Sequence, residues 1–137
     1  MTHEELRAKT RILYAPSDYG HQPYRYHDAT DNMVAKYTGG CGPGGVGDFL
    51  VPDTIWGLNI KPSCSIHDWL YKWGETEGDK ELSDLIFLEN MLRQIEAASP
   101  WLKILRRHRA VNYYGAVKDL GHKAFWKGKV KPSISLT

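Results

Sequence analysis

The sequence lacks any long uninterrupted apolar run, because charged residues, proline or glycine break every stretch that approaches the roughly 18 to 20 residues needed to cross a bilayer. We therefore expect no membrane-spanning helix. Residues 1–14 carry several charged side chains where a secretory signal needs a continuous apolar segment, so no signal peptide is visible. Apolar residues still make up 42% of the chain, which excludes global disorder, and 137 residues fit a single domain.

Cysteine is scarce. The chain has only Cys41 and Cys64, which permit at most one intrachain disulfide. Their spacing fits neither a C-x-x-C redox motif nor a zinc site with four ligands. The cysteine count leaves the cellular compartment open, because a bridge would fit a secreted or virion-associated protein and free thiols a cytoplasmic one.

Acidic residues are almost missing from the last part of the chain. Residues 100–137 hold nine Lys and Arg against Asp119 alone, whereas residues 1–99 hold nine against fifteen Asp and Glu, so the two parts carry +8 and −6. Such clustered cations suit an anionic membrane surface or a nucleic acid, and a solvated helix face is the more common alternative. We do not expect a nucleic-acid partner, and we expect residues 128–137 to form a loose basic tail.

Helical periodicity dominates the sequence and predicts a mainly α fold. Three- and four-residue spacings of apolar side chains are clearest in a stripe formed by Leu82, Leu85, Ile86, Leu88, Met91, Leu92 and Ile95. We expect helices over residues 2–15, 29–37, 63–74, 79–98 and 101–125.

The ends of these segments carry local signals. Thr2 and Ser63 are expected to cap their helices, and Gly115 and Gly121 are weak points in the last one. Residues 49–60 predict a packed connection with room for one short strand. The aromatic residues near the end of the chain are expected to pack in the core or at its rim; these are Trp101, Tyr113, Tyr114, Phe125 and Trp126.

One predicted helix carries a cluster of reactive side chains. Helical spacing places Cys64, His67 and Tyr71 on one face and turns Asp68 away by about 100°. Asp84 interrupts the apolar stripe of the next helix, and an antiparallel hairpin would bring it toward His67. A carboxylate that faces a histidine fixes its tautomer and supports the imidazolium formed in general-base catalysis. Because no serine or thiol is an obvious partner, this histidine would activate a water molecule.

A glycine-rich segment supplies the complementary half of a site. Residues 39–47 hold six of the 13 glycines and cannot form a regular element. Successive glycines let backbone carbonyls converge on one point, which suits Ca²⁺, a hard cation with roughly six to eight oxygen ligands. Asp68 could add a carboxylate. If Cys41 and Cys64 were bridged, this segment would be fastened one helical turn before His67.

These residues resemble the two signatures of the phospholipase A2 superfamily, the calcium loop C-G-x-G-G and the catalytic helix C-x-x-H-D-x-x-Y. The segment Cys41-Gly42-Pro43-Gly44-Gly45 matches the first, and the second is matched at every defining position by Cys64, His67, Asp68 and Tyr71. The resemblance covers residues 39–91. It implies a phospholipase A2-like fold, in which two antiparallel helices carry the His/Asp site beside a calcium loop.

The resemblance also implies an activity, calcium-dependent hydrolysis of a phospholipid acyl ester. His67 is then the general base that acts through water, Asp84 orients it, and Tyr71 hydrogen-bonds that aspartate. The oxyanion is stabilised by Ca²⁺ and by the Gly42 N–H group. The implied partner is a phospholipid membrane surface.

The implied cofactor is Ca²⁺. Its ligands by resemblance are Asp68 and the backbone carbonyls of Gly40, Gly42 and Gly44. The matching cysteines pair with each other in the family, which predicts a Cys41–Cys64 disulfide.

The chain departs from typical members of the superfamily in its disulfides and its spacings. The dense disulfide framework is absent, as it is in the minimal viral members. The connection from Gly42 to His67 is longer than usual, and the one from His67 to Asp84 is shorter than in many members. Residues 52–56, 67–71 and 84–87 with Met91 are also similar to small uncharacterised proteins of bacteriophages and prophages, which favours a minimal bacterial or viral type.

Two other functions are left open by the sequence. One is a catalytically silent viral or phage structural or assembly protein of the same fold, which would tolerate substitution of His67. The other is an anion-binding protein that uses residues 103–131 and binds in a salt-sensitive way.

Overall fold

Six α-helices and one two-stranded sheet make up the described part of the computed structural model, which covers residues 1–38 and 51–131. The expected mainly α fold is confirmed. The helices are α1 (His3–Thr10), α2 (Asp31–Tyr37), α3 (Lys61–Trp73), α4 (Glu77–Ala97), α5 (Lys103–Leu120) and α6 (His122–Trp126). The strands β1 (Thr54–Ile55) and β2 (Leu58–Asn59) form an antiparallel hairpin, and short 3₁₀ turns occupy Tyr26–Asp28 and Pro100–Leu102.

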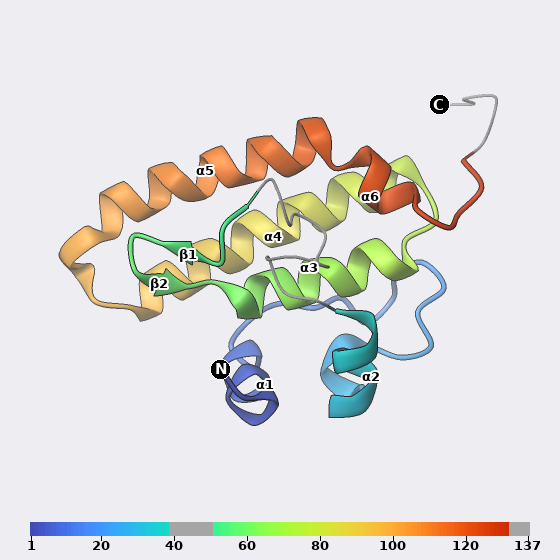
Figure 1. The fold of residues 1–137 in the computed structure, drawn as a ribbon, viewed down its shortest axis with the longest axis horizontal. Helices are drawn as coiled ribbons and strands as arrows, with labels where there is room; N and C mark the ends of the chain where they lie inside the picture. Colours follow the sequence, from blue (N-terminus) through green and yellow to red (C-terminus); the bar gives the residue numbers. More distant parts are fainter. Residues whose placement is uncertain (39–50, 132–137) are drawn as a thin grey trace.

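Helix α3 lies at the centre of the molecule. Every residue from Pro62 to Tyr71 is buried, and this stretch includes the polar residues Ser63, Ser65, His67 and Asp68. Helix α4 runs antiparallel to α3, and α5 packs along the opposite side of α4 (Figure 1). Helices α1 and α2 cover the other flank of α3 (Figure 1). The hairpin of α3 and α4 expected from the sequence is therefore present.

Threonine side chains begin three of the helices. The hydroxyl groups of Thr2, Thr30 and Thr76 each accept a hydrogen bond from a backbone N–H in the first turn of the helix that follows. At Thr76 the cap is reciprocal, because the Asp79 carboxylate accepts from the Thr76 backbone N–H. The long helix therefore begins at Glu77, slightly earlier than expected, and the expected cap at Thr2 is confirmed.

The expected cap at Ser63 is wrong. Helix α3 begins at Lys61, with Pro62 in its first turn, where a missing N–H costs nothing. Ser63 is instead buried, and its hydroxyl donates to Gln94 Oε1 at 2.5 Å. The helix ends at Gly74, as expected.

The expected helix over residues 101–125 is divided in two. It breaks at Gly121 and passes without interruption through Gly115. The segment before α3 contains a hairpin of two short strands where one strand was expected, and Trp56 and Gly57 at its turn have φ of 44° and 79°. A tight hairpin turn needs such positive φ values, but tryptophan at the first position hides the usual sequence signal.

Several apolar residues expected in the core are exposed. Leu82 and Leu85 lie on the solvent side of α4, as do Glu89 and Arg93, because burial against α3 and α5 occupies only the other half of this helix. Trp101 is 80% exposed, so its expected packing is wrong, whereas Phe125 and Tyr113 are buried. The expected apolar pattern in α5 also overestimates burial, since the exposed residues include Leu105, Val111 and Leu120.

Two apolar clusters enclose α3. One lies between α3, α4, α5 and the hairpin, and the other joins α3 to α2, to Ile86 of α4 and to the irregular segment between α1 and α2. Trp69 on α3 and Tyr26 meet edge to face in the second cluster, with ring centroids 5.9 Å apart. In the ranges that the structure describes, none of the helices has the length and apolar character required to span a bilayer.

Candidate active site

The site is built on the facing sides of α3 and α4. His67 and Tyr71 are one turn apart on α3, and Asp84 lies in the second turn of α4. The short connection between the two helices turns at Gly74, where a Cβ atom would lie only 2.5 Å from the Tyr19 hydroxyl. Because Gly74 has no side chain, the turn packs closely against Tyr19, and α4 runs back along α3 so that Asp84 meets His67.

His67 and Asp84 form a buried hydrogen-bonded pair. Their side chains are 3% and 2% exposed, and His67 Nε2 lies 2.8 Å from Asp84 Oδ1. The Tyr71 hydroxyl donates to the same oxygen at 2.7 Å. The structure therefore brings together three of the side chains that the sequence singled out on these two helices, His67, Tyr71 and Asp84.

Aromatic rings fix the plane of the imidazole. The Phe87 ring stacks on it with centroids 4.6 Å apart and a 23° angle between the planes, and the Tyr71 ring approaches with centroids 4.2 Å apart. Within residues 1–38 and 51–131, only Nε2 of His67 has a hydrogen-bond partner. The pair thus presents Nδ1 as the ring nitrogen that can accept a proton.

Burial and hydrogen bonding set the charge states of the pair. Burial lowers the pKa of His67, and the nearby Lys80 charge acts in the same direction, although Asp84 opposes them. Burial alone would raise the pKa of Asp84, but hydrogen bonds and charges from His67, Lys80 and Tyr71 outweigh it and lower the pKa. At neutral pH this favours an ionised Asp84 beside a neutral His67, which is the arrangement a general base needs.

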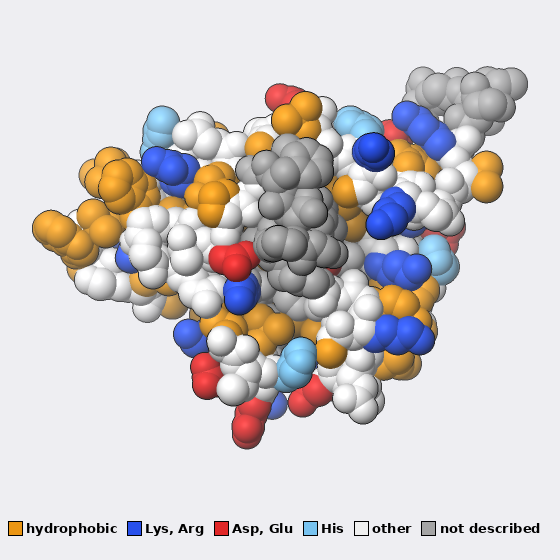
Figure 2. Space-filling model, viewed as in Figure 1, with side chains coloured by type: hydrophobic (Ala, Val, Ile, Leu, Met, Phe, Trp, Pro, Cys, Tyr) orange, Lys and Arg blue, Asp and Glu red, His pale blue; other side chains and the backbone are white. Residues whose placement is uncertain are grey.

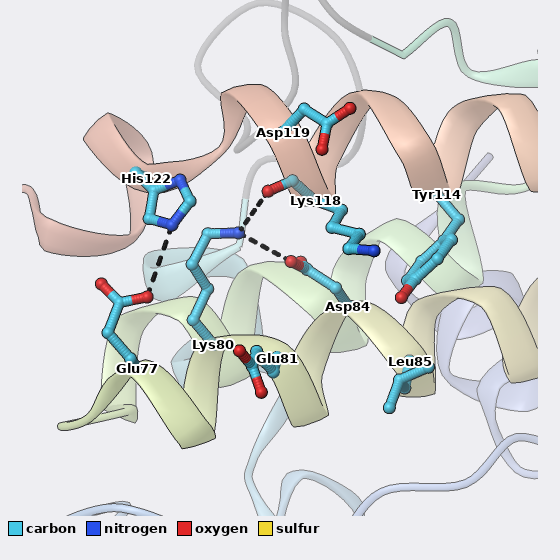
Figure 3. A pocket seen from close by; sticks show the side chains of 9 residues that line it. All are labelled: Glu77, Lys80, Glu81, Asp84, Leu85, Tyr114, Lys118, Asp119 and His122. Carbon is cyan, nitrogen blue, oxygen red and sulfur yellow. Dashed lines mark hydrogen bonds and ion pairs between the residues drawn. The ribbon is translucent and has the colours of Figure 1, made fainter. Parts of the chain in front are cut away.

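Sequence reasoning missed Lys80, the third donor to Asp84. Its Nζ donates to Asp84 Oδ2 at 2.8 Å, and its side chain is 2% exposed. Lys80 and Asp84 also contribute to a pocket of about 570 Å³ between α4 and α5, which is lined mainly by charged side chains (Figure 3). A lysine four residues before an aspartate in a helix is a signal for such a pair, but it usually marks an exposed one.

Asp68 is the member of the expected calcium site that lies in the described residues. Asp68 is 4% exposed and follows His67 directly on α3, and a buried carboxylate of this kind fits the hard oxygen ligand that Ca²⁺ requires. The carbonyls of Gly40, Gly42 and Gly44, and Cys41 with its expected bridge to Cys64, lie outside the described residues. Among the residues that are described, no group of three His, Cys, Asp or Glu side chains could hold a metal ion. The expected calcium site needs no such group, because it combines a single carboxylate with backbone carbonyls.

Comparison with known proteins gives no relative for this chain. No family model, no curated protein and no solved structure matches it. Function is therefore inferred from the residues of the site and from their geometry.

Proposed function

We propose that this protein catalyses calcium-dependent hydrolysis of a phospholipid acyl ester, the reaction of a phospholipase A2-type carboxylic ester hydrolase. The observation that carries the proposal is the 2.8 Å hydrogen bond between His67 Nε2 and Asp84 Oδ1 inside the protein, with Tyr71 on the same carboxylate. The next residue, Asp68, is a buried carboxylate on the same helix. A histidine oriented in this way, next to a carboxylate of the kind that binds hard cations, supports base-catalysed attack by water.

In the proposed mechanism, His67 Nδ1 takes a proton from a water molecule while the water oxygen attacks the ester carbonyl carbon. Asp84 accepts the Nε2–H hydrogen bond throughout and stabilises the imidazolium that forms. When the carbon–oxygen bond to the leaving group breaks, the same proton passes from Nδ1 to the leaving oxygen. The products are a fatty acid and a lysophospholipid, and His67 returns to its neutral form.

Asp68 and the carbonyls of Gly40, Gly42 and Gly44 are the proposed ligands of Ca²⁺, which when bound would polarise the ester carbonyl as a Lewis acid. The chain's own contribution to oxyanion stabilisation is the Gly42 N–H group. Tyr71 acts through Asp84, because its hydroxyl holds the oxygen that faces His67.

The proposed partner is a phospholipid surface, and one exposed region suits it. Hydrophobic side chains gather at the end of the molecule where α5 begins (Figure 2). We call this region the α5 tip and define it by Trp101, Ile104 and Leu105, which are 80%, 79% and 47% exposed. Lys103 and several arginines follow in the same helix turns. Exposed tryptophan beside cations is typical of side chains that enter the interface of an anionic membrane.

Fatty-acid release from vesicles tests the proposal. Mixed phosphatidylcholine and phosphatidylglycerol vesicles would be incubated with the parent protein in Ca²⁺ or in chelator, and with a His67→Asn variant in Ca²⁺. The exposed His108 provides a matched control as His108→Asn. We expect release by the parent and by His108→Asn in Ca²⁺, and none in chelator or with folded His67→Asn.

A different outcome would favour another function. If the folded parent hydrolyses none of several lipid classes in Ca²⁺, the proposed phospholipase activity is rejected. The catalytically silent structural or assembly protein is then favoured. Hydrolysis that survives His67→Asn would reject the proposed base.

A further inference from the structure

A buried lysine lies behind the His67–Asp84 pair. Lys80 Nζ donates to Asp84 Oδ2 at 2.8 Å and to the Lys118 backbone carbonyl at 3.2 Å (Figure 3). It also donates to the Val117 backbone carbonyl at 3.2 Å. An ammonium group has three N–H donors and no acceptor, so these three oxygens account for all of its hydrogen bonds. Hydrogen bonds to one residue of α4 and two residues of α5 therefore fix the direction of the Lys80 side chain.

The donors divide the two oxygens of Asp84 between them. Oδ1 accepts from His67 and Tyr71, and Oδ2 accepts from Lys80. The terminal torsion of an aspartate is broad when nothing holds it. With Lys80 on Oδ2, rotation of the carboxylate would break a charge-assisted hydrogen bond, so Oδ1 stays directed at His67.

Helix α5 takes part in this arrangement through its last turn. The two carbonyls that accept from Lys80 belong to residues near the end of α5, where backbone oxygens carry partial negative charge. The Lys80 ammonium thus lies between a carboxylate and a negative helix end. Helix α5 is in this way connected to His67 through Lys80 and Asp84, although none of its side chains hydrogen-bonds to His67.

We propose that Lys80 is a positioning residue of the active site, which holds Asp84 in the orientation that aligns His67 and makes this orientation depend on the end of α5. The inference rests on the proposed function, because it concerns the same histidine. Stability alone is a weak explanation for Lys80, since a buried ion pair can often be replaced by apolar side chains without loss.

Lys80→Met tests the inference, because methionine keeps an unbranched side chain and removes the charge. Tyr113→Phe is the matched control. The Tyr113 hydroxyl donates to the Thr54 carbonyl at 2.9 Å, so its removal loosens α5 from the hairpin without touching Asp84. For each folded variant, kcat and KM would be measured in Ca²⁺, and the Nε2–H proton resonance of His67 would be recorded by NMR at one pH in chelator.

We expect Lys80→Met to lower kcat about tenfold or more with little change in KM, by analogy with the hydrogen-bond partners that orient metal-bound histidines. The His67 Nε2–H resonance should shift or broaden, because its acceptor is no longer held. Tyr113→Phe should lower the melting temperature and leave kcat and the resonance unchanged. Parent-like kcat together with a parent-like resonance in Lys80→Met would overturn the inference.

A second measurement keeps the inference testable if Lys80→Met does not fold. In the parent protein labelled with ¹⁵N-lysine, the Nζ–H signal of Lys80 should be protected from exchange with water and should shift in Asp84→Asn. An unprotected signal that Asp84→Asn leaves in place would overturn the positioning role. Both NMR measurements omit Ca²⁺ and lipid, so a parent without hydrolytic activity would reject the phospholipase and leave the role of Lys80 decidable.

Discussion

Gly121 gives the sharpest test of how the end of α5 meets the active site. A Cβ atom at this position would lie 2.4 Å from the Tyr71 hydroxyl and 2.4 Å from the Val117 carbonyl oxygen. Ordinary contact begins at 3.4 Å, so the hydroxyl would have to move by 3.4 − 2.4 = 1.0 Å. Since the Tyr71 hydroxyl lies 2.7 Å from Asp84 Oδ1, a displacement of this size can remove that hydrogen bond.

The magnitude for Gly121→Ala follows from three effects. Loss of a hydrogen bond to a charged group costs about 1.5 to 3 kcal/mol, and overpacking costs about 1 to 3 kcal/mol. Gly121 has φ of −84°, which alanine can adopt, so the smaller conformational entropy of alanine in the unfolded chain returns about 0.4 to 1 kcal/mol. We therefore expect the free energy of unfolding to fall by about 2 to 4 kcal/mol, as measured by urea denaturation monitored by circular dichroism.

Gly115 supplies the control within the same helix. Nothing lies within 4 Å of a Cβ atom at Gly115, so Gly115→Ala should stabilise the protein by about 0.5 to 1 kcal/mol. In a Tyr71→Phe background the cost of Gly121→Ala should shrink, because the hydroxyl that clashes is gone. A Gly121→Ala variant that is as stable as the parent would refute the reasoning, as would an equal cost with and without the hydroxyl.

Three further predictions concern pH, lipid binding and the cysteines. The pKa values of His67 and Asp84 are lowered from 6.5 and 3.8 in the folded state, so the unfolded state binds more protons, and stability should decline as pH falls below about 6.5 and again below about 3.8. Urea titrations in chelator should show the first decline in the parent and a smaller one in His67→Asn, because burial also lowers the pKa of His27; a decline of unchanged size would exclude His67 as a source. Trp101→Ala should weaken sedimentation with anionic vesicles in chelator while changing the free energy of unfolding by less than about 0.5 kcal/mol, and unchanged sedimentation would remove the α5 tip from the membrane contact. Reduction of the expected Cys41–Cys64 bridge should lower stability by about 3 kcal/mol, whereas two thiols titrated in the native unreduced protein would show that the bridge is absent.

Local sequence signals predicted the helices well where a cap or a stop residue defined them. Thr2 and Gly74 act at the expected ends, and Gly121 breaks the last helical segment. Each of these signals depends on a few neighbouring residues, so it can be read without knowing the fold. The approach of Asp84 to His67 was also predictable, because two helices joined by a short glycine-containing connection must run antiparallel.

Burial was predicted less well, because it depends on which helices are neighbours. Leu85 repeats with the apolar stripe of α4 but faces solvent, whereas Lys80 reads as a surface residue and is buried. Both results follow from the position of α5, which covers the side of α4 that carries Lys80 and Asp84. Periodicity gives the faces of a helix, but not which of them a distant helix will cover.

The arrangement around Asp84 favours a chemical role over a purely structural one. A lysine, an aspartate and a histidine in one buried group cost desolvation free energy, which apolar side chains of similar volume would avoid. A protein that needed the α3–α4–α5 packing only for assembly would gain nothing from this group. Such a protein would also have no use for the orientation of His67, whose Nε2 is fixed to the Asp84 carboxylate while Nδ1 has no hydrogen-bond partner in the described part of the chain. The hypothesis of a catalytically silent structural protein therefore leaves the costly, oriented histidine unexplained, whereas the hypothesis of an enzyme explains it directly. For this reason, loss of activity in folded His67→Asn separates the two functions.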